Sequence, residues 1–303
     1  MSANTSPGET TTRPRIIVFA GPNGSGKTTI TESLKHQGAF PATYINADDI
    51  ARTELGHMPD LFRRNLSAAK LAEQRRNHAL EKGISFACET VMSTPGKLAL
   101  LQQAKSNGFQ VELVFITTCD AEINIARISN RAALGAHSVA PDKVRERYAR
   151  AMRLVPSALE LADTFEAFDN STTKPMRVAT KCDQTLVQMN ADKAPLWVAK
   201  HLLEPWRERM DSRARIVETF RQTVAKMPGE LKDADIRHGK SYAGFVLAVT
   251  KHHILQKIGT NEYIVHDRSL CPPVQLETGK TALLAYQYEQ GGKHVEQARN
   301  ARA

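Results

Sequence analysis

The chain has 303 residues, of which 41% are hydrophobic and 24% charged, with 41 Lys and Arg against 32 Asp and Glu. This composition is that of a soluble globular protein with at least one sizeable core, and no apolar run approaches the roughly 18 residues of a membrane span. The formal charge of +9 is spread over both halves of the chain without a basic run of five residues, which favours a mildly basic surface over a dedicated nucleic-acid face.

Residues 1–14 are polar, turn-rich and without periodicity, so we expect a disordered lead-in rather than a secretory signal. The chain has four cysteines, far apart and without a CxxC pair: Cys88, Cys119, Cys182 and Cys271. They are expected to be free thiols in a reducing compartment, which favours a cytoplasmic protein, not bound to a membrane, over a disulfide-bonded or zinc-binding one.

Short apolar runs alternate with helical patterns from residue 15 onward. In chain order they predict a strand at 15–20, a helix at 27–37, a strand at 42–46, helices at 50–55 and 63–82, a strand at 84–88, a helix at 95–107, a strand at 110–117, helices at 120–134 and 141–154, and strands at 165–169 and 176–180. Such alternation favours an α/β fold, with a doubly wound parallel sheet, crossover helices and a helical lid.

The pattern changes after about residue 192. A helix is predicted at 195–215, and a further helix reaches residue 227. From 242 to 271, short apolar strands are separated by tight turns, which is typical of an antiparallel meander. We therefore divide the chain into a lead-in (1–14), an α/β domain (15–204), and a helical linker with a small α+β domain (205–303).

A phosphate-binding loop follows the first predicted strand. Residues 21–28, GPNGSGKT, match G-x-x-x-x-G-K-[ST], with a buried strand before the loop and a helix after it. Backbone N–H groups of such a loop surround a phosphate, its lysine reaches the β- and γ-phosphates, and its last hydroxyl ligates Mg²⁺. The loop therefore predicts a nucleoside triphosphate site with Thr28 as the Mg²⁺ ligand. The residues expected to bind the nucleotide are Gly21, Asn23, Gly24, Ser25, Gly26, Lys27, Thr28 and Thr29.

GTPases, mechanical ATPases and small-molecule kinases share this loop, so the acidic residues that follow it decide between them. Asp48 and Asp49 come after the strand predicted at 42–46, and the carboxyl ends of parallel strands meet at one crevice. A kinase needs a carboxylate there to orient the acceptor hydroxyl and take its proton, and Asp48 is the candidate base. The alternative is a helix N-cap, because either aspartate suits the start of a helix at 50–55.

Two further groups of polar residues are expected at the same crevice. Glu89 and Thr90 follow the third predicted strand and are candidates for binding substrate hydroxyls or a metal-bound water, with a surface acid or capping-box partner as the alternative. Guanidinium groups on a mobile lid place positive charge on a transferring phosphoryl group. A solvated basic helix face is the alternative for three of the five arginines concerned, which are Arg127, Arg131, Arg145, Arg147 and Arg150.

Together these motifs resemble the zeta toxin family of P-loop kinases, in family order and over roughly residues 13–190. The matching segments are GPNGSGKTT at 21–29, INADDIA at 45–51, FACETVMS at 86–93, R-x₅-H at 131–137 with RERYAR at 145–150, and FDNS at 168–171. The resemblance implies an ATP- or GTP-dependent kinase that uses Mg²⁺ and phosphorylates the sugar 3′-hydroxyl of UDP-N-acetylglucosamine. Such an enzyme is a toxin that blocks the supply of cell-wall precursors.

The resemblance also implies roles for individual residues and for a partner. Two departures lie in the lid, where they bear on the identity of the acceptor: Gly135-Ala136-His137 replaces Gly-Gly-His, and Ser138-Val139-Ala140 replaces Asp-Val-Pro. No antitoxin-like helical bundle is found at either end, so an antitoxin is expected to be a separate chain. The family's functional positions match Asp48 as the base, Lys27 in the loop, Glu89 and Thr90 at the sugar nucleotide, and Arg131 and Arg147 in the lid.

Residues 239–249, with Gln256 and Val265-His266, resemble the KfrB-type module of plasmid-encoded proteins, which carries no catalytic motif. The module suggests an alternative function, that of a nucleotide-dependent protein of plasmid maintenance that binds DNA. An acid at the second strand end and a basic lid have no evident use in that role, so a kinase acting on a small nucleotide sugar is favoured. Hairpin residues rather than a metal site are expected at His252, His253, His266 and Asp267.

Overall fold

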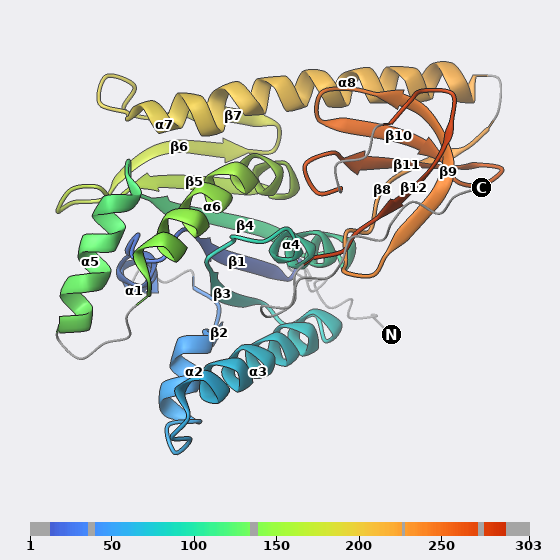
Figure 1. The fold of residues 1–303 in the computed structure, drawn as a ribbon. Helices are drawn as coiled ribbons and strands as arrows, with labels where there is room; N and C mark the ends of the chain where they lie inside the picture. The colour runs from blue at the N-terminus through green and yellow to red at the C-terminus, as the bar shows by residue number, and fades with distance from the viewer. Residues whose placement is uncertain (1–12, 36–39, 134–138, 226–227, 272–275, 289–303) are drawn as a thin grey trace, which may run out of the picture.

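The computed structural model describes residues 13–35, 40–133, 139–225, 228–271 and 276–288. They form a seven-stranded sheet A and a five-stranded sheet B, with helix α8 running across the top of both (Figure 1). The first part of the chain contains β1 (Arg15–Ala20), α1 (Lys27–Lys35), β2 (Thr43–Ile45), α2 (Ala47–Thr53), α3 (Leu61–Glu81), β3 (Phe86–Thr90), α4 (Gly96–Ser106), β4 (Gln110–Thr117), α5 (Ala121–Ala133), α6 (Pro141–Leu161), β5 (Thr164–Asp169), β6 (Met176–Cys182) and β7 (Thr185–Gln188). The second part contains α7 (Leu196–Val198), the π-helical turn η1 (Ala199–Leu203), α8 (Glu204–Val224), β8 (Glu230–Asp233), β9 (Ser241–Val249), β10 (His253–Lys257), β11 (Glu262–Asp267) and β12 (Thr281–Ala285).

Sheet A has the strand order β2-β3-β1-β4-β5-β6-β7. The first five strands in this order run parallel, and β6 and β7 extend the sheet antiparallel at one edge. Parallel neighbours need a crossover connection, and the helices between the strands provide it. The predicted α/β fold with a parallel sheet is therefore confirmed.

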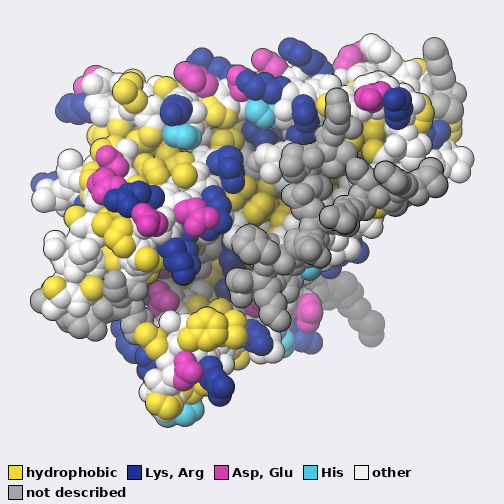
Figure 2. Space-filling model, viewed as in Figure 1, with side chains coloured by type: hydrophobic (Ala, Val, Ile, Leu, Met, Phe, Trp, Pro, Cys, Tyr) yellow, Lys and Arg dark blue, Asp and Glu magenta, His cyan; other side chains and the backbone are white. Residues whose placement is uncertain are grey.

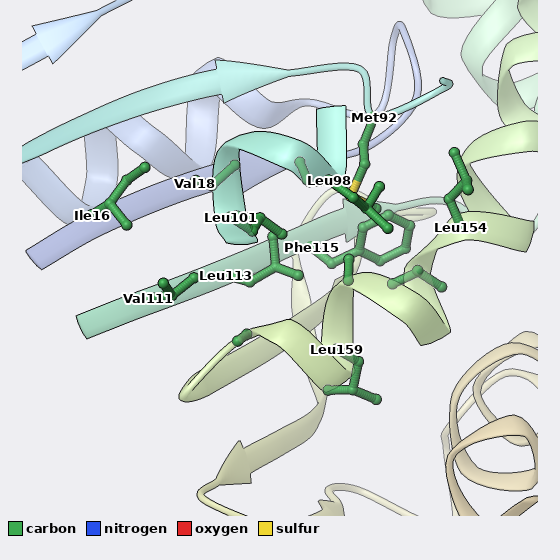
Figure 3. Close-up of a cluster of buried hydrophobic side chains, with 14 of the residues drawn as sticks. Ile16, Val18, Met92, Leu98, Leu101, Val111, Leu113, Phe115, Leu154 and Leu159 are labelled. Atoms are coloured by element: carbon green, nitrogen blue, oxygen red, sulfur yellow. The ribbon is translucent and has the colours of Figure 1, made fainter. Parts of the chain in front are cut away.

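Apolar side chains cover both faces of sheet A. Along β1, Ile16 and Val18 join the larger cluster with α4 and α6, whereas Ile17 and Phe19 join Ile30 of α1 on the other face. Strands buried on both faces are apolar without alternation, which explains why the sequence predicts β1 and β4 with the same bounds that the structure has. Figure 3 shows the larger cluster, with Ile16, Val18, Met92, Leu98, Leu101, Val111, Leu113, Phe115, Leu154 and Leu159 labelled.

Several elements of the first part differ from the sequence predictions, among them α6, β3 and β7. Helix α6 continues beyond the predicted end at 154 to Leu161, with Pro156 inside it. The last turns of α6 are buried in the core, and this packing outweighs the cost of a proline within a helix. Strand β3 runs from Phe86 to Thr90 rather than from residue 84 to residue 88. It therefore contains Glu89 and Thr90. Strand β7 is not predicted, because its four residues are only partly buried and form no apolar run.

The helical segment from α7 to α8 is continuous and runs through residues 204 and 205. Its first half contacts sheet A, where the Trp206 ring lies 5.1 Å from the ammonium of Lys181. Its second half covers sheet B, where the rings of Phe220 and Tyr263 lie 5.3 Å apart edge to face. Within the described residues, no helix is long and apolar enough to cross a membrane.

Sheet B contains the predicted meander. Strands β9, β10 and β11 are antiparallel neighbours, while β8 adds to β11 in parallel and β12 adds to β9 antiparallel. Of the histidines expected in hairpins, His252 lies in the turn, but His253 and His266 lie within strands and are buried. The described residues contain no group of three or more His, Cys, Asp or Glu side chains that could hold a metal ion.

Buried polar contacts join sheet B to α4 and α6. Arg209 of α8 is 3% exposed and lies 2.7 Å from Glu160 of α6 and 2.6 Å from Asp267 of β11. The side-chain amide of Gln102 in α4 accepts a hydrogen bond from the backbone N–H of Ile236 at 2.8 Å. The same amide donates a hydrogen bond to the backbone carbonyl of Ala234. Sheet B is thus fixed to the helices that cover one face of sheet A.

Candidate functional site

The phosphate-binding loop connects β1 to α1 at the carboxyl edge of sheet A. Gly24 has a φ of +77° and Gly26 a φ of +88°, a left-handed conformation that other residues disfavour. A Cβ on Gly26 would also lie 2.2 Å from the side-chain nitrogen of Asn170. The Asn170 amide donates to the Ser25 carbonyl at 2.8 Å and so holds the loop from the end of β5. Both glycines are therefore required by the conformation of the loop.

Lys27 is the first residue of α1, and its side chain folds back over the loop. Its Nζ donates to the carbonyls of Gly21 and Pro22 at 2.9 and 3.0 Å. Burial lowers the pKa of Lys27 from 10.5 to about 8, while the carboxylates of Glu89 and Asp48 oppose this shift by stabilising the ammonium. Both acids therefore lie within electrostatic reach of the phosphate-binding lysine.

The two aspartates at the start of α2 have different environments. The N-cap of α2 is Asn46, whose Oδ1 accepts a hydrogen bond from the backbone N–H of Asp48 at 2.9 Å. The N-cap interpretation of the aspartates is therefore wrong, because the preceding asparagine has that role. Asp49 pairs with Arg52 at 2.8 Å. The Asp48 side chain is exposed and has no hydrogen bond or ion pair within the described part of the chain, so it is available to a substrate.

Glu89 is held by three hydroxyl groups from two neighbouring elements. It lies on β3 beside β1, where it is the register partner of Phe19. Its Oε1 accepts hydrogen bonds from the Tyr44 hydroxyl at 2.7 Å and from Thr31 Oγ1 at 3.1 Å. Its Oε2 accepts from Thr28 Oγ1 at 3.4 Å. The surface-acid and capping-box alternatives do not describe these contacts, which belong to the edge of the phosphate-binding loop.

Thr90 supports the loop from the next position of β3. Its carbonyl accepts a hydrogen bond from the Gly21 N–H at 3.2 Å, and its hydroxyl oxygen accepts from the Met92 N–H at 3.2 Å. Met92 has a φ of +51°, which turns the chain sharply after the strand. Because a hydroxyl is both acceptor and donor, the Thr90 O–H can still donate to a ligand.

Two of the five arginines act at the loop. Arg147 of α6 donates to Asn23 Oδ1 at 3.2 Å, and Arg131 of α5 is close enough to Lys27 to lower its pKa further by like-charge repulsion. The predicted lid residues 134–138 lie outside the described residues. Local contacts hold the other three arginines: Arg127 donates to the Thr172 carbonyl, Arg145 pairs with Glu122 and Asp142, and Arg150 pairs with Glu146.

Four polar side chains of the site are not among the sequence candidates, namely Thr31, Tyr44, Asn46 and Asn170. Thr31 lies four residues after Lys27 on α1, a spacing that places both on one helix face and could have identified it. Asn170 belongs to the FDNS segment, whose residue types alone indicate no role. Tyr44 reaches Glu89 only because of the register between β2 and β3, for which the sequence has no direct signal.

The oxygen atoms beside the loop suit Mg²⁺. Thr28 and Thr29 are exposed on the first turn of α1, and Thr28 Oγ1 lies 3.4 Å from Glu89 Oε2. Mg²⁺ prefers oxygen ligands and is usually bound by one or two protein groups together with substrate phosphates and waters. The donor set of Thr28 and Glu89 therefore fits a phosphate-bound Mg²⁺, for which a larger cluster of protein ligands is not needed.

A cavity of about 820 Å³ lies away from the loop, between α4, α6 and sheet B. Its charged side chains are already paired within the protein, as in the contacts of Arg209 with Glu160 and Asp267 and of Arg213 with Asp233 at 2.5 Å. A charged ligand would have to break these pairs. Figure 2 shows the mixed charges of the surface, without a field of one sign on the visible face.

Two family models match the chain. The model of the zeta toxin family matches residues 3–199, and that of the KfrB domain matches residues 241–295. An uncharacterized protein of Haemophilus influenzae is 34% identical over 134 residues, which are 44% of this chain and 92% of that protein.

Several solved structures are also similar to the chain. The PezAT chromosomal toxin-antitoxin system of Streptococcus pneumoniae has 18% identity and a TM-score of 0.42, over 55% of this chain and 73% of that chain. A putative kinase from Chloroflexus aurantiacus has 20% identity and a TM-score of 0.38, over 45% and 78%. The complex AvrRxo1-ORF1:-ORF2 with ATP has 17% identity and a TM-score of 0.45, over 59% and 62%.

Proposed function

Because the chain belongs to the zeta toxin family of nucleotide-dependent kinases, we propose that it transfers the terminal phosphoryl group of ATP or GTP to a hydroxyl of a small molecule. One observation carries the proposal, namely that the Asp48 carboxylate beside the loop is exposed and has no hydrogen bond or ion pair within the described part of the chain, while it is near enough to stabilise the Lys27 ammonium. A carboxylate without an internal partner at this place is what an acceptor hydroxyl needs in order to be oriented and deprotonated.

The reaction is a direct transfer between two oxygens. The acceptor oxygen bonds to the γ-phosphorus, the bond from phosphorus to the bridging oxygen breaks, the nucleoside diphosphate leaves, and the acceptor proton passes to Asp48. Lys27 and the loop N–H groups hold the phosphates, while Arg131 and Arg147 place positive charge on the transferring group. Mg²⁺, when bound beside Thr28, neutralises phosphate charge.

The acceptor that we propose is the sugar 3′-hydroxyl of UDP-N-acetylglucosamine. The motifs shared with the zeta toxin family support it, because they include the acids at both strand ends. Glu89 and Thr90 offer an acceptor and a donor for sugar or phosphate groups beside the loop. Phosphorylation at this position would block the use of the nucleotide sugar for cell-wall synthesis, so the activity would be toxic.

A toxic kinase of this kind needs restraint in the cell that makes it. We therefore propose a separate antitoxin chain as its partner, and the cytoplasm as its compartment, since both nucleotide substrates are made there. We also propose that residues 15–204 form the kinase domain and that residues 205–303 form a helical linker with an accessory domain. DNA binding by that accessory domain is an outcome of the test below rather than part of the proposal.

The direct test is transfer of one phosphate. The protein is incubated with ATP or GTP, Mg²⁺ and a panel of nucleotide sugars, and the products are examined for a mass gain of one phosphate. We expect the gain on UDP-N-acetylglucosamine, its loss in Asp48→Asn, and its retention in Asp49→Asn, where the neighbouring acid is paired with Arg52. Nucleotide hydrolysis without any acceptor, together with salt-dependent DNA binding, would favour the plasmid-maintenance function instead.

A further inference from the structure

We propose that Tyr44 and Asn46 are positioning residues that hold the base Asp48 in register with Glu89. The inference rests on the proposed function, because it concerns how the two acids of that site are set relative to each other. Three hydrogen bonds form a network from Asp48 to Glu89. The Asp48 N–H donates to Asn46 Oδ1 at 2.9 Å, Asn46 Nδ2 donates to the Tyr44 hydroxyl at 3.1 Å, and the Tyr44 hydroxyl donates to Glu89 Oε1 at 2.7 Å.

This hydrogen-bond network connects two elements that the backbone holds only weakly together. Glu89 lies on β3, in the interior of sheet A, whereas Asp48 lies in the first turn of α2 after β2. Strand β2 is three residues long and forms the edge of the sheet, so few backbone hydrogen bonds fix the start of α2. The side-chain contacts provide the additional connection between the two acids.

Asn46 is suited to this role because both ends of its amide are used. The side chain is buried, its oxygen caps α2, and its nitrogen reaches Tyr44. A serine can cap a helix equally well but has no second polar end that could extend to the tyrosine. The cap and the connection can therefore be separated by mutation.

The Tyr44 hydroxyl acts as a fixed donor. Burial and the hydrogen bond to Glu89 raise the pKa of Tyr44 well above its usual value of 10, so the hydroxyl keeps its proton. The ring is held independently, with the Lys35 ammonium 4.0 Å from its centroid and the Phe40 ring at 5.9 Å. Replacement by phenylalanine therefore removes the donor while keeping the ring and its contacts.

The expected consequence is on transfer rather than on nucleotide binding. Misplacing reacting groups lowers the rate of a positioned reaction, and losing a hydrogen bond to a charged group corresponds to a change of about 10- to 100-fold. We expect Tyr44→Phe and Asn46→Ser each to lower kcat/KM for the acceptor by about that factor. The Kd for the nucleotide alone, measured without Mg²⁺, should stay within about twofold, because neither residue makes a hydrogen bond to the loop itself.

A matched control and a double variant make the test specific. Tyr242→Phe also removes one hydroxyl from a half-buried tyrosine, whose oxygen accepts from the Asp235 N–H at 2.7 Å in sheet B, and it should leave transfer unchanged. The double variant Tyr44→Phe/Asn46→Ser should lose little more kcat/KM than either single variant, because both substitutions interrupt the same hydrogen-bond network.

The outcomes separate this inference from the proposed function. If the unchanged protein phosphorylates no acceptor, the proposed function fails before the variants are measured. If the unchanged protein is active and both variants match it in kcat/KM, the positioning role is overturned. It is also overturned if the two losses in kcat/KM are additive and the variants lose nucleotide affinity and melting temperature as well. A loss confined to transfer, shared by the two variants and absent in Tyr242→Phe, supports it.

Discussion

Nucleotide binding should depend on pH through Lys27. The pKa of this lysine in the free protein is about 8, lowered mainly by burial. A bound phosphate stabilises the ammonium, so the pKa in the complex lies above that of the free protein, and affinity is full below pH 8 and declines above it. About 90% of Lys27 is charged at pH 7 and about 10% at pH 9, so the apparent affinity should fall about tenfold between these values.

The assay is titration of the protein with a fluorescent triphosphate analogue from pH 6.5 to 9 at constant Mg²⁺ and ionic strength. The terminal phosphate is fully ionised over the upper part of this range, so the ligand contributes little to the decline. Lys27→Arg keeps its charge at every pH tested, and its affinity should not vary between pH 7 and 9, whatever its absolute value. A flat profile for the unchanged protein, or the same decline in Lys27→Arg, would show that the lysine is not the group that titrates.

Three further predictions concern the loop and the core. Gly26→Ala should abolish triphosphate binding in a titration at pH 7 and lower the unfolding free energy by about 1–3 kcal/mol, because the φ of +88° and the Asn170 amide oppose a Cβ; retained binding would contradict it. Phe115→Ala, at a fully buried position, should cost about 3–5 kcal/mol in urea unfolding, and a cost below about 1 kcal/mol would show that the site collapses. Arg209→Ala should cost about 3–5 kcal/mol by removing the buried guanidinium that pairs with both Glu160 and Asp267, whereas Arg145→Ala at an exposed pair should cost less than about 1 kcal/mol, and equal melting temperatures for the two would refute the distinction.

Much of sheet A can be predicted from the sequence because its central strands are buried on both faces. An apolar run between Pro14 and Gly21 specifies β1, and a run rich in apolar and β-branched residues after Gly108 specifies β4, with the bounds that the structure has. Local rules fail where tertiary packing opposes them, as in α6, which passes through Pro156 because its last turns are in the core. They also fail for the edge strands β7, β8 and β12, which are short and partly exposed; β8 and β12 depend in addition on a neighbour that lies elsewhere in the sequence.

The candidate site shows the same division. The rule that parallel strands end at one edge of a sheet predicts that Asp48 and Glu89 lie near the phosphate-binding loop. In the structure both carboxylates are close enough to stabilise the Lys27 ammonium. The rule says nothing about which side chains support them. The contact of Tyr44 with Glu89 depends on the register of β2 against β3, and Asn46 is placed beside Tyr44 as the N-cap of α2.

The C-terminal part of the chain contacts the α/β part close to the β3 side of the phosphate-binding loop. Strand β3 carries Glu89 and Thr90, the chain turns at Met92, and α4 begins at Gly96. A Cβ on Gly96 would lie 3.3 Å from the ring of Tyr288, and Met92 belongs to the same buried cluster as that tyrosine. The segment between Thr90 and α4 is therefore packed close to Tyr288, the last of the described residues. Gln102, near the middle of α4, binds the segment that follows β8, so the C-terminal part of the chain contacts this helix both at its start and in its middle.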